Sequence, residues 1–391
     1  MKKIGLLPRL IIAIILGIIF GSFMPEWFIR AFATFNGIFG NFLNFAIPLI
    51  IIGFVVPGIG DLGAGAGKIL ALTAGVAYLS TVIAGSLAYF VDITIFPTFL
   101  KEGALVMDAA NPEHQLLTGY ITIDMPPIME VMTALIFSFL MGLGIAAIKG
   151  TVIKNAFNEL QEIISKLISN VIIPLLPFHV CGIFSNMTKA GTVFQILSVF
   201  ARVFLIIIIL HIIIIVVQYT IAGVTAGKNP FKLIRNMIPA YMTAVGTQSS
   251  AATIPITLGQ TKKNGVREQV ADFVVPLCAT IHLSGSTITL TSCALAIMMM
   301  NGMDYSFGNI FPFILMLGVT MVAAPGVPGG AVMAALGILQ SMLGFDETLT
   351  ALMIALYLAQ DSFGTACNVT GDGAIAIFVD KVTAGWKKAN K

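Results

Sequence analysis

The feature that most constrains this chain is a succession of apolar runs, each long enough to cross a lipid bilayer as a helix. A helix needs about 20 apolar residues to span the hydrocarbon core, whereas membrane strands are shorter and alternate in polarity. The runs here are continuous, so the sequence predicts an all-α polytopic membrane protein. Six of them precede residue 226, at about 8–27, 39–59, 68–99, 126–148, 156–187 and 192–225.

Composition agrees with a membrane protein and excludes several function classes. Hydrophobic residues make up 58% of the 391 residues and charged residues 10%, whereas a soluble domain carries about a quarter charged residues. The four cysteines lack CxxC spacing, so we expect neither disulfides nor a zinc framework. No GxxxxGK[ST] motif occurs, which argues against ATP-driven transport by this chain alone. We find no nucleophile–base pair and expect neither an enzyme nor a nucleic-acid partner.

The pattern changes after residue 230, where apolar segments are interrupted by polar residues, Gly and Pro. Segments 231–262 and 308–345 read as broken hairpins, each followed by a span with a polar break. Such repetition is typical of inverted-repeat transporters, in which re-entrant hairpins and discontinuous helices meet near the membrane midplane. The sequence therefore predicts eight transmembrane helices plus two re-entrant helical hairpins, with the last span broken at 368–372. The alternative is that the hairpins are ordinary spans kinked at proline.

Basic residues predict the orientation of these spans. In the predicted topology both termini share one side with the loops near 60–68, 149–166, 226–236 and 261–267, and those segments hold 17 of the 21 Lys and Arg residues. Cytoplasmic segments of membrane proteins carry an excess of basic residues. We therefore expect a multi-pass protein of the cell membrane with both termini in the cytoplasm, its first apolar run being a retained span.

The final apolar stretch, 357–380, carries polar residues that a lipid-facing helix would not contain. In a helix, Asp361, Thr365, Asn368 and Asp372 lie on one face. Two carboxylates at membrane depth are costly, so they should meet cations or line a wet cavity. The intervening glycines allow another backbone to come close or the helix to loosen. The alternative is a helix end near the membrane surface, where charges cost little.

Four separated motifs resemble the dicarboxylate/amino acid:cation symporter family, the glutamate-transporter homologues. They are TQSSAATIP at 247–255, PLCATIHLSGS at 276–286, GVPG at 326–329 and NVTGD at 368–372. The resemblance covers most of the chain and is densest from residue 247 to 380. It implies a homotrimer in which a mobile transport unit carries the substrate across by an elevator-like movement, with the second hairpin as the external gate.

The resemblance also implies how the chain divides. A scaffold would comprise spans 1–2 at 1–60 and spans 4–5 at 126–190, separated by an external loop at 101–125. The transport unit would comprise span 3 at 61–100 and everything from 191 to 391: span 6, hairpin 1, span 7, hairpin 2, span 8 and a basic tail.

By the same resemblance, Asp361 would receive the amino group of an amino-acid substrate, and Thr365 and Asn368 would hydrogen-bond it. Hairpin amides suit a substrate carboxylate. The predicted substrate-binding residues are Gln248, Ser249, Ser250, Ser286, Val327, Gly329, Asp361, Gly364, Thr365 and Asn368.

Sodium ions would be the coupling ions, since sodium takes carboxylate and carbonyl oxygens. The resemblance implies three sites. The first would use the Asp372 carboxylate with backbone carbonyls of Cys278, His282 and Asn368. The second would use Thr280, Val322 and Ala324. The third would use Tyr78, Thr81 and Ser284, but Ser284 stands where the family has an Asp, so this site should bind sodium poorly.

Departures from the family pattern bear on the substrate. The Arg that acidic-substrate members carry three residues after the amine-binding Asp is Gly364 here, and the arginine of some first hairpins is Gln248. Neither residue can pair bidentately with a side-chain carboxylate. The leading hypothesis is therefore sodium-coupled uptake of a small neutral amino acid resembling serine, threonine or alanine.

Other functions stay open from the sequence alone. One is symport of an acidic amino acid or a dicarboxylate, and another is proton coupling through His282, which would otherwise be a neutral hydrogen-bonding core residue. An anion-conducting channel is the alternative from a different class. No cofactor other than sodium is expected.

Overall fold

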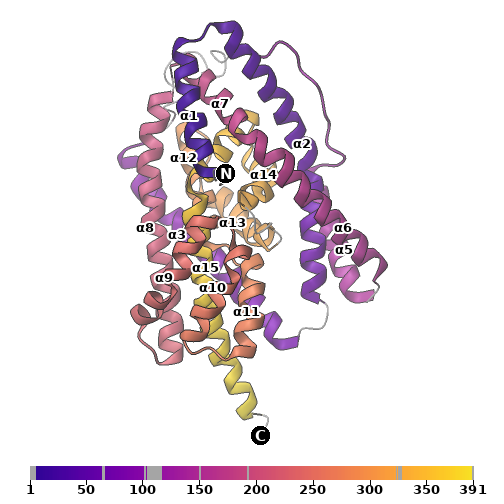
Figure 1. The fold of residues 1–391 in the computed structure, drawn as a ribbon, viewed down its shortest axis with the longest axis vertical. Helices are drawn as coiled ribbons and strands as arrows, with labels where there is room; N and C mark the ends of the chain where they lie inside the picture. The colour runs from indigo at the N-terminus through magenta and orange to yellow at the C-terminus, as the bar shows by residue number, and fades with distance from the viewer. Residues whose placement is uncertain are drawn as a thin grey trace, which may run out of the picture.

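The computed structural model describes residues 6–63, 67–100, 103, 117–148, 151–191, 193–322, 324 and 328–389, and they contain helices and loops but no strand. Figure 1 shows them as a long helical bundle. In chain order the elements are α1 (Leu6–Phe23), α2 (Glu26–Gly63), α3 (Gly67–Ile95), the 3₁₀ turn η1 (Phe96–Thr98), α5 (Val131–Ile148), α6 (Val152–Leu167), the π-helical turn η2 (Ile168–Ile172), α7 (Ile173–Lys189), α8 (Val193–Ala226), α9 (Pro230–Thr247), α10 (Ser250–Lys263), α11 (Glu268–Ile281), α12 (Ser284–Met300), α13 (Phe307–Met321), α14 (Gly330–Leu343) and α15 (Glu347–Ala389).

The all-α polytopic prediction is confirmed. Within the described residues, five helical segments are long and apolar enough to cross a membrane, and shorter apolar helices accompany them. The second run begins earlier than expected, because α2 extends back to Glu26. The fourth begins later, at Val131, since Pro126 and Pro127 lie in a non-helical segment and cannot donate helical hydrogen bonds. The long spans are Glu26–Pro57, Lys68–Thr98, Val152–Lys189, Val199–Ala226 and Glu268–Met300.

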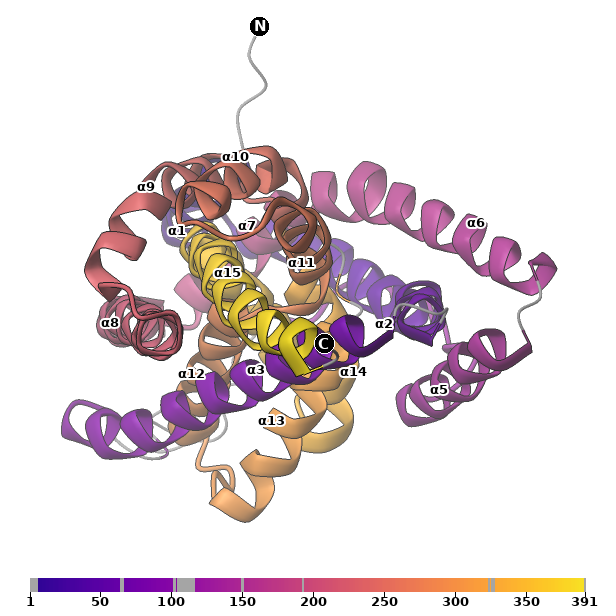
Figure 2. The ribbon, with the colours of Figure 1, turned by 90° about the horizontal axis from the view of Figure 1, so that it is seen from below.

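The helices pack in two groups. Helix α2 contacts α5, α6 and α7, and α1 runs against α7, whereas α15 contacts α8, α9, α10, α11 and α12. Figure 2 shows α5 and α6 at one side of the molecule, beyond α2, with the second group gathered on the other side. The predicted division into a scaffold and a mobile transport unit stays a prediction, because packing alone says nothing of movement. Most of the predicted external loop, 101–125, lies outside the described residues.

Two helical hairpins occupy the predicted positions. Helices α10, α13 and α14 have 14, 15 and 14 residues, or about 21–23 Å at 1.5 Å per residue. That length is too short for a hydrocarbon core of about 30 Å. The turn of the first hairpin places Gln248 in the left-handed conformation (φ 54°), and the Ser249 hydroxyl caps α10 by accepting from Ala252 N (3.2 Å). The span between the hairpins is broken, with α11 ending at Ile281 and α12 beginning at Ser284.

The expected break of the last span at 368–372 is wrong. Helix α15 runs without interruption from Glu347 to Ala389. Its glycines serve close packing instead: a Cβ at Gly371 would lie 2.6 Å from Gln218 Oε1, and one at Gly373 would lie 2.6 Å from Tyr219 Oη. The Thr370 hydroxyl donates to Ala366 O within the helix (2.7 Å).

Ion pairs fix the lower end of the second group, where the C-terminus lies in Figure 1. Arg267, which precedes α11, pairs with the Asp380 carboxylate and donates through Nη2 to Asp380 O (2.8 Å). Lys262, at the end of α10, lies 2.8 Å from Asp272 and 2.9 Å from Glu268. The hydrogen bonds to these two carboxylates raise the pKa of the Lys262 ammonium. These ion pairs connect the end of hairpin 1 and the loop after it to α11 and to the C-terminal part of α15.

Candidate substrate and cation site

The polar face of α15 is buried at the centre of the second helix group. Asp361, Asn368 and Asp372 are 4%, 2% and 1% exposed. Burial in an apolar bundle is tolerated only where polar groups find partners. Each of these side chains meets a different neighbouring element, so the face divides into three adjoining regions.

The first region joins Asp361 to the second hairpin. Gly329 N donates to Asp361 Oδ2 (2.7 Å) from the residue that caps α14. Gly329 has φ 75°, a conformation in which glycine meets no steric cost. Tyr357 and Thr365, one helical turn before and after Asp361, flank its carboxylate. The end of hairpin 2 therefore closes directly over a buried negative charge, which suits an ammonium group better than an anion.

The second region joins Asn368 to the start of α12. Asn368 Oδ1 accepts from Gly285 N (2.7 Å) and Ser286 N (3.2 Å), and its Nδ2 donates to Ser286 Oγ (2.9 Å). Tyr357 Oη also donates to Ser286 Oγ (2.9 Å). Amides of a first helical turn lack intrahelical acceptors, so Asn368 satisfies two of them. The Asn368 side chain therefore holds the start of α12 against α15, in addition to any contact with a substrate.

Gly364 lies where α12 and α15 are in close contact. A Cβ there would be 3.6 Å from both Ser286 N and Thr289 Oγ1, which is ordinary van der Waals contact. On the facing helix, a Cβ at Gly285 would come within 2.5 Å of Gly364 O. The position at which acidic-substrate members of the family carry an Arg therefore lies close to the start of α12 in this chain.

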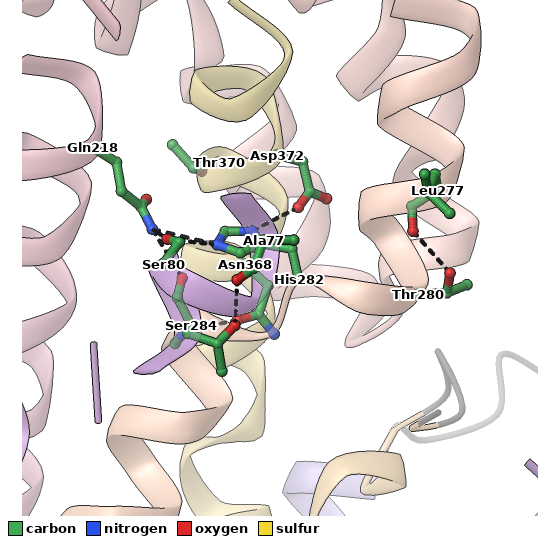
Figure 3. A network of polar contacts seen from close by, with 12 residues as sticks. Ala77, Ser80, Gln218, Leu277, Thr280, His282, Ser284, Asn368, Thr370 and Asp372 are labelled. Carbon is green, nitrogen blue, oxygen red and sulfur yellow. Dashed lines mark hydrogen bonds and ion pairs between the residues drawn. The ribbon is translucent and has the colours of Figure 1, made fainter. Parts of the chain in front are cut away.

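The third region, drawn in Figure 3, surrounds Asp372 and His282. His282 Nδ1 lies 3.0 Å from Asp372 Oδ1, and both side chains are buried. The other ring nitrogen, Nε2, lies 3.1 Å from Ser80 Oγ. Gln218 Nε2 donates to Ser80 Oγ (3.0 Å) and to Ser284 Oγ (3.1 Å). The break between α11 and α12 positions His282, because its backbone is extended there.

The first predicted sodium site contains the types of oxygen atom that sodium binds. Asp372 supplies a carboxylate, and the Cys278 thiol and the unwound backbone after Ile281 lie near it. Cys278 O already accepts from His282 N (2.9 Å), but a carbonyl has a second lone pair. These residues fit a sodium ion, which takes carboxylate and carbonyl oxygens. The ion would have to share Asp372 with the imidazole of His282.

The other two predicted cation sites fit less well. At the third site, Ser284 Oγ accepts from Gln218, Thr81 Oγ1 donates to Ala77 O (3.0 Å) and Tyr78 Oη donates to Leu315 O (3.3 Å). All three side chains are neutral and are already hydrogen-bonded to other neutral groups of the protein. At the second, Thr280 is exposed and its hydroxyl donates to Leu277 O (2.8 Å). Val322 and Ala324 follow α13, each with its N–H bonded to a carbonyl three residues earlier.

The remaining predicted substrate residues belong to the hairpin ends. Gln248, Ser249 and Ser250 form the turn of hairpin 1 and the start of α10. Val327, predicted in the end of hairpin 2, lies outside the described residues.

Several residues of the site were missed by sequence reasoning. Ser80 and Gln218 complete the network around His282, Tyr357 supports Ser286, and His211 Nε2 donates to Gly285 O (3.0 Å). Gln218 and His211 interrupt a very apolar run, and a polar residue in a membrane span is a functional signal. That signal was available in the sequence.

Comparison with known proteins assigns this chain to a family. Residues 6–382 match the sodium:dicarboxylate symporter family. The chain belongs to that family. A serine/threonine transporter, SstT, from Streptococcus thermophilus is 25% identical over 99% of this chain and 98% of its own length. Excitatory amino acid transporter 1 from Ambystoma tigrinum is 30% identical over 63% of this chain and 46% of its own.

Membership of the sodium:dicarboxylate symporter family confirms the resemblance carried by the four motifs. It makes transport the activity of the family, with sodium in its name. The family name leaves open which side chains of this member touch substrate or ion, so the roles above stay predictions.

Proposed function

We propose that this member is a secondary active symporter that couples sodium entry to uptake of a small neutral amino acid such as serine, threonine or alanine. The observation that carries the proposal is the pairing of a buried Asp361 with the closing end of hairpin 2. A carboxylate buried without a basic partner is complementary to one ammonium group. A zwitterionic amino acid supplies that ammonium and leaves its own carboxylate for hairpin amides.

The surroundings of Asp361 support a neutral side chain on the substrate. The groups that interact with Asp361 are Gly329, Tyr357 and Thr365, and those nearest to a Cβ at Gly364 are Ser286, Thr289 and Gly285; all six are uncharged. Burying a substrate carboxylate among them would leave it without a cation. A hydroxyl or methyl group needs only a small polar or apolar neighbour. The full-length similarity to a protein named as a serine/threonine transporter agrees with this preference.

In this proposal Asp372 contributes to the sodium site, and α3 and α8–α15 move as one transport unit in each protomer of a homotrimer in the cell membrane. The extensive packing of α15 on α8, α9, α11 and α12 supports a unit that moves as a body. Both termini would lie in the cytoplasm, as the distribution of basic residues indicates.

Uptake of labelled serine into proteoliposomes tests the coupling. Sodium and pH gradients are imposed separately, with an Asp361→Asn protein as the control for specific uptake. An inward sodium gradient should drive accumulation above equilibrium in the wild type and not in the variant. Accumulation that is equal with and without a sodium gradient would contradict sodium symport.

A further inference from the structure

A second buried carboxylate lies outside the site described above. Asp92, in the last turn of α3, is 0% exposed, and among the described residues no donor meets the geometry of a hydrogen bond to either of its carboxylate oxygens. Buried polar atoms of folded proteins nearly always have partners, so an exception of this kind calls for an explanation. A carboxylate inside a membrane span is by default a functional candidate.

The groups nearest to Asp92 are neutral. The Ser292 hydroxyl of α12 lies beside the carboxylate, and the Cys293 thiol is close enough to interact with it electrostatically. Ser292 Oγ likewise has no described neighbour in hydrogen-bond geometry, so Asp92 is the polar group available to it. Gln360 of α15 approaches Cys293 through Nε2 (3.7 Å from Sγ), and its Oε1 is also unpartnered. These four residues, Asp92, Ser292, Cys293 and Gln360, form the outer polar cluster.

No described cation neutralises the cluster from the helices packed on α3. His211 of α8 donates to Gly285 O, and His282, after α11, is bonded to Asp372 and Ser80. Arg202 of α8 lies over the Phe99 ring. Described parts of α13 carry no titratable side chain. On α3 itself, Tyr89 Oη donates to Tyr305 O.

An isolated ionised carboxylate in an apolar interior is so costly that the group takes up a proton instead. A protonated Asp92 could donate to Ser292 Oγ, which would give each side chain one hydrogen-bond partner. We propose that Asp92 is a proton-binding site of the transport unit, and that a proton bound there from the outside crosses with the unit and dissociates inside. The carboxylate gains one proton on one side and loses it on the other, and no other bond changes.

The outer polar cluster also adjoins the substrate region. Cys293 interacts electrostatically with Tyr357, which flanks Asp361, and Gln360 is the residue before Asp361 on α15. A change of charge at Asp92 is therefore within reach of the proposed ammonium site. By linkage, proton binding and substrate binding must affect each other equally.

Infrared difference spectroscopy of the whole protein tests the protonation directly and does not depend on the proposed function. The spectrum of wild type minus Asp92→Asn should contain the carbonyl stretch of a protonated carboxylic acid. Ser292→Ala should shift that band without removing it, because the proton loses one acceptor. A carboxylate band in place of the acid band would overturn the proposal. If Asp92→Asn does not fold, a comparison with Asp92→Glu gives the same assignment through a shifted acid band.

Proteoliposomes with a trapped pH-sensitive dye test the movement of the proton, and this arm rests on the proposed amino-acid transport. Serine and an inward sodium gradient should acidify the interior with the wild type. Asp92→Asn should lose the acidification and keep its sodium dependence, and Asp92→Glu should restore it. Unchanged acidification by Asp92→Asn would overturn the proposal, as would an increased sodium requirement, which would indicate a sodium ligand. Absence of serine uptake by the wild type would contradict the proposed function and leave the infrared result standing.

Discussion

His282 Nδ1 lies 3.0 Å from Asp372 Oδ1, so a histidine after the broken helix α11 is bonded to a carboxylate on the continuous helix α15. Gly371 makes this approach possible, because a Cβ there would lie 2.7 Å from His282 Cε1. The imidazole and a sodium ion would both use the Asp372 carboxylate. Because of that competition, removing the His282 imidazole and removing the Asp372 carboxylate should change sodium affinity in opposite directions.

Substituting His282 by Asn should lower the sodium concentration needed for half-maximal substrate binding, since the carboxylate is released from the imidazole. Asp372→Asn should raise that concentration. A change of about tenfold in each direction corresponds to about 1.4 kcal/mol. Sodium titrations of substrate binding by calorimetry measure both. Ser80→Ala removes a neighbour of Nε2 but leaves the Asp372 bond, so it should change little. Equal weakening by His282→Asn and Asp372→Asn would mean that the His282 imidazole is itself a sodium ligand.

Asp361→Asn should reduce amino-acid affinity by at least about 100-fold, because a buried charge-assisted pair is worth about 3 kcal/mol. An Asn at this position can still accept from Gly329 N, so hairpin 2 should still close and the protein should stay folded. Calorimetric titration with serine measures the affinity, and size-exclusion chromatography monitors the fold. Wild-type affinity in the variant would remove Asp361 from the site.

Asn368→Ala should destabilise the protein by about 2–3 kcal/mol, since it leaves Gly285 N and Ser286 N without an acceptor in a buried region. Thr370→Val is a matched control two residues away, because its hydroxyl bonds only within α15. Thermal unfolding in detergent compares the two variants. Equal midpoints would show that Asn368 does not hold the start of α12.

Gly285→Ala should be more damaging than Gly75→Ala, although both glycines lie in helices. A Cβ at Gly285 would meet Gly364 O and Cys367 Cβ at 2.5 Å, whereas one at Gly75 meets nothing within 4 Å. Gly75→Ala should be neutral or slightly stabilising, because Ala has the higher helix propensity. Folded yield and thermal midpoint measure the difference. A well-folded Gly285→Ala protein would contradict the close crossing of α12 and α15.

The sequence predicted the membrane class, both hairpins and a polar break in the span that follows the first hairpin, because apolar run length and interrupted runs are local signals. It failed at 368–372, where Gly371 and Gly373 looked like helix breakers. Glycine permits either a break or a close approach, and the choice depends on Gln218 and Tyr219, about 150 residues earlier in the chain. Asp92 was overlooked although it is a carboxylate inside the run 68–99. Its isolation from cations could be seen only once α3, α12 and α15 were placed together.

Competition against uptake of labelled serine tests the central claim most directly. Unlabelled serine, alanine, threonine, aspartate and succinate are added in turn to proteoliposomes with a fixed sodium gradient. The neutral amino acids should compete, and aspartate and succinate should not, because the described groups nearest to Asp361 and Gly364 supply no cation for a second carboxylate. Stronger competition by aspartate or succinate than by serine would contradict the account.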